Sequence, residues 1–213
     1  MKILLTGFKP FAGLKMNSSQ LIVEEIVLRT QGLPGIEVTG EVLPTEFESA
    51  GNRIQELIHS LVPEIILSLG MSSGQNELNL ERVALNLDDS TLPDNTGFSP
   101  EEKPIVDDGP LAYLSNMPLR YLKMKLEKKG IPVKISNHGG TYVCNHVFYL
   151  ALHQISKSGI DAICGFIHVP LIAKNDVSVG THKITFNRLV EAVEYCLKLM
   201  TKKDNLRFCN NTF

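Results

Sequence analysis

The stretch TYVCNHVFYLALHQISKSGIDAICGFIHVP, residues 141–170, decides the fold class. Its first half, Tyr142–Ser156, is largely apolar and has the length of a helix. Its second half, Ala162–Val169, is a continuous apolar run of strand length that stops just before Pro170. Such a run is typical of a strand buried inside a sheet. A helix followed by a buried strand indicates an α/β fold.

Strand-like and helix-like segments alternate along the rest of the chain as well. Strands are expected at residues 2–6, 36–43, 65–69, 78–87 and 133–136, and helices at 18–30, 46–61, 119–129 and 184–202, with a long loop at 88–108. This order predicts a single-domain three-layer α/β/α sandwich with a mostly parallel central sheet. The domain is expected to span residues 1–203, and residues 204–213 form a polar, loosely held C-terminal tail.

Composition and charge exclude several classes of function. Of the 213 residues, 43% are hydrophobic and 21% are charged, and the formal net charge is -2. These values are ordinary for a globular domain, and no basic excess marks a nucleic-acid-binding surface. No window approaches the ~18 apolar residues of a membrane span, and the apolar run at the N-terminus is too short for a signal peptide. We therefore expect a cytoplasmic protein with no nucleic-acid or membrane partner.

The chain has four cysteines, namely Cys144, Cys164, Cys196 and Cys209. No two of them are close enough in sequence for a CxxC redox or zinc motif, so we expect free thiols and no bound metal. Cys164 lies in the middle of a predicted strand and Cys196 on an apolar helix face. A cysteine in such a position is most often a small buried hydrophobic residue.

Cys144 differs from the others in its position. A predicted strand runs into His138, Gly139 and Gly140, and Cys144 falls in the first turn of the helix that follows. The unpaired N–H groups and the positive end of the helix dipole favour a thiolate there, and the same groups can hold an oxyanion. Position alone leaves two interpretations open, an activated nucleophile and a small buried side chain.

A cysteine nucleophile needs an imidazole within hydrogen-bond reach. His168 ends a buried strand, and sites in open parallel sheets form beyond such strand ends; His138, in the turn before Cys144, is a rival. Glu81 shares the apolar face of an alternating strand, where a carboxylate needs a partner to offset its desolvation. Orienting the imidazole would provide one, and a structural ion pair with another cation is the alternative.

Five motifs in this order resemble those of the pyroglutamyl peptidase I family of cysteine peptidases. They are TGFKPF (residues 6–11), ERVALN (81–86), LPDN (92–95), SNHGGTYVCN (136–145) and FIHVP (166–170). The resemblance extends from residue 1 to about residue 200. Each motif is moderately specific, and five in register are strongly specific.

The resemblance implies an omega peptidase that removes an N-terminal pyroglutamyl residue through a thioester, on an α/β/α fold, without metal or organic cofactor. By similarity, Cys144 is the nucleophile, His168 the general base and then acid, and Glu81 the orienting carboxylate. The lactam ring of the substrate is expected against Phe8 and Phe11, and Val143 is a further expected substrate-binding residue. For the two phenylalanines, plain core packing is the alternative. The expected partner is a pyroglutamyl peptide, and the family includes monomers and tetramers, which allows a homo-oligomer.

The chain also departs from the family pattern. Gly139 stands where Ala is usual, Ser73 where Gly, Ala or Pro is usual, and Asn79 where Ser or Thr is usual. Thr91 stands where bacterial and archaeal members carry an arginine, which animal-type members also lack, and the segment after Pro170 is shorter than in bacterial members. A second hypothesis is therefore a catalytically weak member that binds pyroglutamyl peptides without cleaving them.

Overall fold

A computed structural model describes residues 1–72, 74–171 and 184–201 and confirms the α/β class. Over this part of the chain the helices are α1 (Ser18–Thr30), α2 (Phe47–Leu61), α3 (Leu119–Lys128), α4 (Val143–Ser158) and α5 (Phe186–Met200). The strands are β1 (Lys2–Phe8), β2 (Glu37–Leu43), β3 (Ile65–Ser72), β4 (Leu78–Leu85), β5 (Ala112–Leu114), β6 (Val133–His138) and β7 (Ile163–Pro170). The predicted boundary between domain and tail lies outside the described residues.

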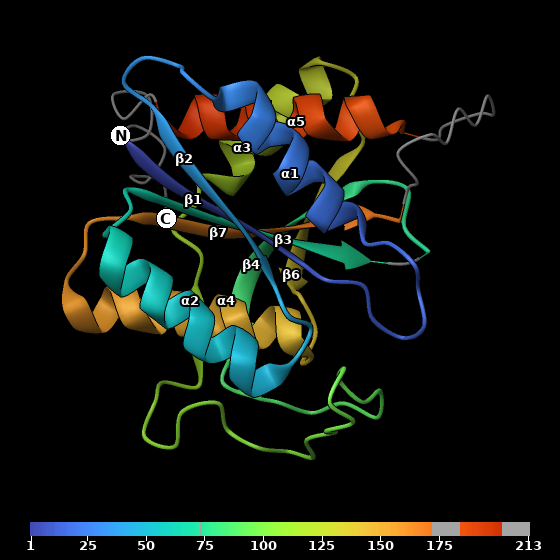
Figure 1. Ribbon diagram of the computed structural model, residues 1–213, viewed down its shortest axis with the longest axis vertical. Coiled ribbons are helices and arrows are strands. Elements are labelled where there is room, and N and C mark those ends of the chain that lie inside the picture. Colours follow the sequence, from blue (N-terminus) through green and yellow to red (C-terminus); the bar gives the residue numbers. More distant parts are fainter. Residues whose placement is uncertain (73, 172–183, 202–213) are drawn as a thin grey trace.

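The sheet lies between two layers of helices, as the sequence predicts (Figure 1). Helices α1, α3 and α5 cover one face, and their apolar side chains form one buried cluster with that side of the sheet. Helices α2 and α4 cover the other face and form a second buried cluster. No helix in the described part of the chain is long and apolar enough to cross a membrane.

The sheet is mostly parallel, but its direction changes next to β7. Strands β2, β1, β3 and β7 are neighbours in that order and run parallel. Strand β4 pairs antiparallel with β7 through Asn79 and His168, and β6 pairs parallel with β4 on its other edge. Strands β6 and β7 therefore run in opposite directions. His168 lies near the carboxyl end of β7 as expected, but the strand that precedes Cys144 is not parallel to β7.

Several predicted strand ends are also too early, and one strand is missed. Strand β3 continues through Gly70 to Ser72, and β6 continues to His138. Gly70 is part of this strand. A glycine is needed there because an added Cβ would lie 2.8 Å from the imidazole of the neighbouring His168. Strand β5 has only three residues, of which Ala112 and Leu114 are exposed, so it has no apolar alternation to detect.

Asn145 fixes the first turn of α4 against the end of β4. Its side chain is 1% exposed. Its Oδ1 accepts the Leu85 N–H at 2.9 Å, and its Nδ2 donates to the carbonyl oxygens of Leu85 at 2.9 Å and Leu87 at 3.0 Å. Because Asn145 follows Cys144 directly, these three bonds also set where the thiol lies.

We expect Asn145→Ala to lower the free energy of unfolding by about 2–4 kcal/mol, because it leaves buried backbone groups of β4 without partners. Urea unfolding of the variant measures this loss. Ser156→Ala on an exposed position of the same helix serves as the control and changes stability by less than about 0.5 kcal/mol. Equal stabilities of the two variants would contradict the role of Asn145.

Candidate active site

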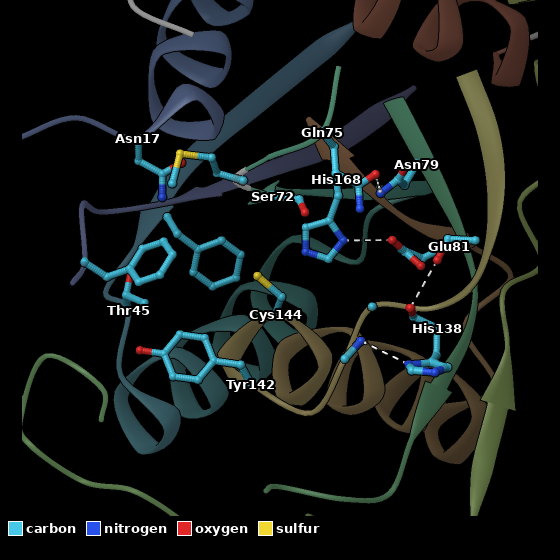
Figure 2. A pocket seen from close by; sticks show the side chains of 16 residues that line it. Asn17, Thr45, Ser72, Gln75, Asn79, Glu81, His138, Tyr142, Cys144 and His168 are labelled. Atoms are coloured by element: carbon cyan, nitrogen blue, oxygen red, sulfur yellow. Dashed lines mark hydrogen bonds and ion pairs between the residues drawn. The ribbon is translucent and has the colours of Figure 1, made fainter. Parts of the chain in front are cut away.

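A cavity of about 360 Å³ opens where β1, β3 and β7 end and β4 begins. It is lined by all three predicted catalytic residues, Cys144, His168 and Glu81. Figure 2 shows the Cys144 thiol turned toward the His168 ring, with Glu81 on the far side of that ring. The structure therefore brings together a thiol, an imidazole and a carboxylate that the sequence separates by as much as 87 positions.

The strand pairing explains why Glu81 reaches His168. Asn79 of β4 lies directly opposite His168 of β7, and Glu81 shares the face of Asn79 because strand side chains alternate. The His168 Nδ1 lies 2.8 Å from Glu81 Oε1, and the two residues are 7% and 1% exposed. Glu81 thus holds the imidazole by Nδ1 and leaves Nε2 for Cys144.

Two glycines make room for this ring. A Cβ at Gly70 would lie 2.8 Å from the imidazole, and one at Gly139 would lie 3.0 Å from His168 Cε1. The Phe166 ring packs beside it, with ring centroids 4.8 Å apart. These contacts restrict the orientations open to the imidazole. An alanine at Gly139, as the family resemblance expects, would contact His168 directly.

The surroundings of His168 raise its pKa to about 9. Burial by itself lowers the pKa, and the hydrogen bonds and charges of Cys144 and Glu81 outweigh it. The imidazole is therefore protonated near neutral pH, which favours a thiolate beside it. Because the folded pKa lies above the ordinary value of 6.5, this contribution to stability is complete below about pH 6.5 and is lost as pH rises through about 9.

Cys144 is the second residue of α4 and is partly exposed to the cavity. Among the described residues, none accepts a hydrogen bond from the backbone N–H of Val143 or Cys144, whereas the next two N–H groups bind the Tyr142 carbonyl. Free N–H groups at a helix N-terminus attract negative charge. A thiolate and an oxyanion at Cys144 would both lie beside these donors.

The predicted pocket residues divide into two groups. Phe8 and Phe11 line the cavity, and Phe8 is also 2% exposed and part of the core. Val143 does not line the cavity, and its side chain is fully buried in the core below the sheet. The helix turns the Val143 side chain inward, so the substrate-binding role expected for this residue has no support from its side chain.

Several further cavity residues were not predicted from sequence, among them Asn17, Thr45 and Tyr142. Asn17 was recognisable only as a helix cap, and the structure confirms that its side chain accepts the Ser19 N–H. Tyr142 stands two residues before the cysteine in the YVCN motif, and its ring centroid lies 5.8 Å from that of Phe11. Burial, with the charges of Asp94 and Cys144, raises the pKa of Tyr142 to about 12, so its hydroxyl stays neutral.

The loop at residues 88–108 is attached through Asp94 to the side of the cavity that carries Phe11 and Tyr142. Asp94 Oδ2 accepts the Phe47 N–H at 3.0 Å, and Oδ1 accepts the N–H groups of Thr96 at 2.8 Å and Phe98 at 3.0 Å. Burial alone would raise the pKa of Asp94, and these hydrogen bonds outweigh it and lower the pKa. The ionised carboxylate therefore joins the loop to the start of α2.

Other residues singled out by sequence lie outside this centre. Thr91 is exposed and does not line the cavity. His146 turns away from Cys144, and its Nδ1 lies 2.7 Å from Asp88 Oδ2. His138 lines the cavity, but its Nδ1 accepts the Gly140 N–H at 3.2 Å. Within the described ranges, no group of three His, Cys, Asp or Glu side chains could hold a metal ion.

A thiol, an imidazole and a carboxylate in series, at strand ends of an α/β sheet, form the arrangement that cysteine hydrolases share. The sequence profile of the pyroglutamyl peptidase family, Peptidase_C15, matches residues 1–203, and the chain belongs to this family. This confirms the family that the five motifs indicated.

Individual relatives agree with the family match. The pyrrolidone-carboxylate peptidase of Oceanobacillus iheyensis is 41% identical over 196 residues, which cover 92% of this chain and 97% of that protein. That of Thermococcus onnurineus is 35% identical over 202 residues, or 95% of this chain and all of the relative. A solved structure of a mutant pyrrolidone carboxyl peptidase from Pyrococcus furiosus has a TM-score of 0.87 at 33% identity and covers 95% of this chain and 99% of its own.

We expect iodoacetamide to label Cys144 in the native protein at least about tenfold faster than Cys164 or Cys196. Burial raises the pKa of Cys164 well above its usual range and that of Cys196 to about 12. Mass spectrometry of tryptic peptides after timed labelling gives the separate rates. Labelling in urea is the control, since all thiols then react, and equal native rates would contradict the assigned environments.

Proposed function

We propose that this chain is a cysteine peptidase that hydrolyses the bond after an N-terminal pyroglutamyl residue, with Cys144 as nucleophile. The observation that carries the proposal is the Cys144–His168–Glu81 series, with 2.8 Å between His168 Nδ1 and Glu81 Oε1, at a cavity with an aromatic wall. Membership of the pyroglutamyl peptidase family supports the substrate class.

The reaction is acyl transfer in two stages. In the first, the Cys144 thiolate attacks the pyroglutamyl carbonyl carbon, and the N–H groups of Val143 and Cys144 receive the oxyanion. His168 donates its Nε2 proton to the leaving amine, the C–N bond breaks, and a thioester remains. In the second, His168 takes a proton from water, the hydroxide attacks the thioester, and pyroglutamate leaves as Cys144 is restored. Glu81 holds the imidazole in one orientation throughout.

The aromatic half of the cavity fits the neutral lactam ring. Pyroglutamate has no charged α-amine, so recognition needs flat apolar contacts and a few hydrogen bonds rather than a carboxylate. Phe8, Phe11 and Tyr142 provide such contacts. Asn17 and Thr45 line the same cavity and offer polar groups.

The decisive test is release of a fluorescent amine from a pyroglutamyl amide in the presence of a thiol reductant. Wild type should release it, and Cys144→Ala should lose at least about a thousandfold in kcat/KM while remaining folded. Cys196→Ala, at a buried position of α5 away from the cavity, should lower stability but retain turnover. A folded wild type that binds pyroglutamyl peptides without cleaving them would favour the binding-protein hypothesis.

The raised pKa of His168 predicts how activity varies with pH. We expect kcat/KM to fall as pH rises through about 9, because His168 then loses the proton that the leaving amine needs. Glu81→Gln removes one of the two groups that raise this pKa, so the alkaline fall should move to lower pH and the maximum rate should drop. An unshifted profile in Glu81→Gln would remove Glu81 from the mechanism.

A further inference from the structure

The cavity has a second, polar half that the proposed chemistry leaves unused. In Figure 2, Asn17, Thr45 and Tyr142 lie on one side of the Cys144–His168 pair, and Gln75, Asn79 and His138 lie on the other. The polar side also includes Ser136, Gly139 and Gly140. If the lactam ring occupies the aromatic side, the peptide that follows it must leave past His168, which protonates its amine.

His138 lies next to that path. A Cβ at Gly139 would lie 3.0 Å from His168 Cε1, so Gly139 is in contact with the proposed acid, and His138 is the residue directly before it. His138 is exposed and lines the cavity. In the leaving residue, the carbonyl oxygen is three bonds from the scissile nitrogen, within about 4 Å. The first carbonyl group of the leaving peptide therefore falls within reach of this turn.

The hydrogen bonds of the turn determine which nitrogen of His138 remains free to donate a hydrogen bond. Its Nδ1 accepts the Gly140 N–H at 3.2 Å, and its carbonyl oxygen accepts from Ser136 Oγ at 3.1 Å. A neutral imidazole that accepts at Nδ1 carries its proton on Nε2. Among the residues that the structure describes, none accepts a hydrogen bond from this Nε2. His138, which lines the cavity, thus has one N–H donor that no described residue uses.

Gln75 brings a second polar group from the segment after β3. Asn79 is 4% exposed, and its Nδ2 donates to Gln75 Oε1 at 2.8 Å. This bond ties Gln75 to β4, next to the pairing of Asn79 with His168. In Figure 2 the His168–Glu81 pair lies between Gln75 and His138, so the two side chains border the polar half from different segments of the chain, the connection between β3 and β4 and the end of β6.

We propose that His138 and Gln75 form a subsite for the leaving peptide, in which His138 Nε2–H donates to the first carbonyl group after the scissile bond. The inference rests on the proposed function and extends it to specificity. Substrates whose leaving group carries a carbonyl at this position gain a hydrogen bond, and simple aromatic amides do not. His138, the rival base in the sequence, becomes a specificity-determining residue rather than a catalytic one.

The test compares two substrates with the same acyl group, pyroglutamyl-Ala-Ala-amide and pyroglutamyl-aminomethylcoumarin. His138→Phe keeps a ring and removes the donor. We expect it to lower the ratio of kcat/KM for the peptide to that for the coumarin amide by roughly 3- to 10-fold, the range of one net hydrogen bond, mainly through a higher KM for the peptide. His138→Gln retains a side-chain N–H donor and should keep the ratio within about twofold.

Gln75→Met gives an independent measurement if the aromatic replacement does not fold, and it should lower the ratio in the same direction. Thermal unfolding of each variant shows whether the fold is intact. A ratio that stays at the wild-type value in Gln75→Met and in a folded His138→Phe would overturn the subsite while leaving the peptidase proposal standing. A wild type that cleaves neither substrate would overturn the proposed function, and this inference with it.

Discussion

The pairing of β4 with β7 is the constraint on which the site depends. With Asn79 opposite His168, the alternation of strand side chains places Glu81 beside the imidazole, 2.8 Å from Nδ1. A shift of one residue in this register would turn Glu81 to the other face of the sheet. The register is stabilised in turn by apolar side chains of β4 and β7, including Leu80 and Ile167, which belong to one buried cluster. Catalytic geometry and core packing therefore share one strand pair.

Burial strengthens the interaction between His168 and Glu81, and it also makes the loss of either partner costly. At 7% and 1% exposure, both groups are largely removed from solvent, so each depends on the other, and His168 also depends on Cys144. Removing one partner leaves an uncompensated buried charge, which costs far more than the pair contributes in place. Gly70 and Gly139 add a steric condition, because side chains there would displace the ring. The surroundings thus hold a protonated imidazole beside the thiol before any substrate arrives.

Sequence periodicity predicts the layers well but not the order and direction of strands. The helices and the long strands follow from apolar patterns of period 3.6 and 2, and Cys144, His168 and Glu81 follow from position and motif. Pairing partners are set by contacts between distant segments, so the opposite directions of β6 and β7 leave no local signal. The same holds for Val143, whose inward turn depends on how α4 packs against the sheet. Cavity walls that are assembled from several loops cannot be predicted from the sequence for the same reason.

The loop over the aromatic half shows how such a wall is held in place. The Asp94 carboxylate accepts three backbone N–H groups, Asn95 Nδ2 donates to the Pro10 carbonyl oxygen at 3.0 Å, and the Tyr142 hydroxyl donates to the Pro93 carbonyl oxygen at 3.1 Å. These bonds join the loops that carry Phe11 and Tyr142, so the two rings are positioned by backbone contacts rather than by the substrate. A pocket ordered in advance loses less entropy when it binds a rigid ring. Under the proposed function, such an ordered wall favours a small neutral lactam, because flexible walls would also admit larger or charged residues.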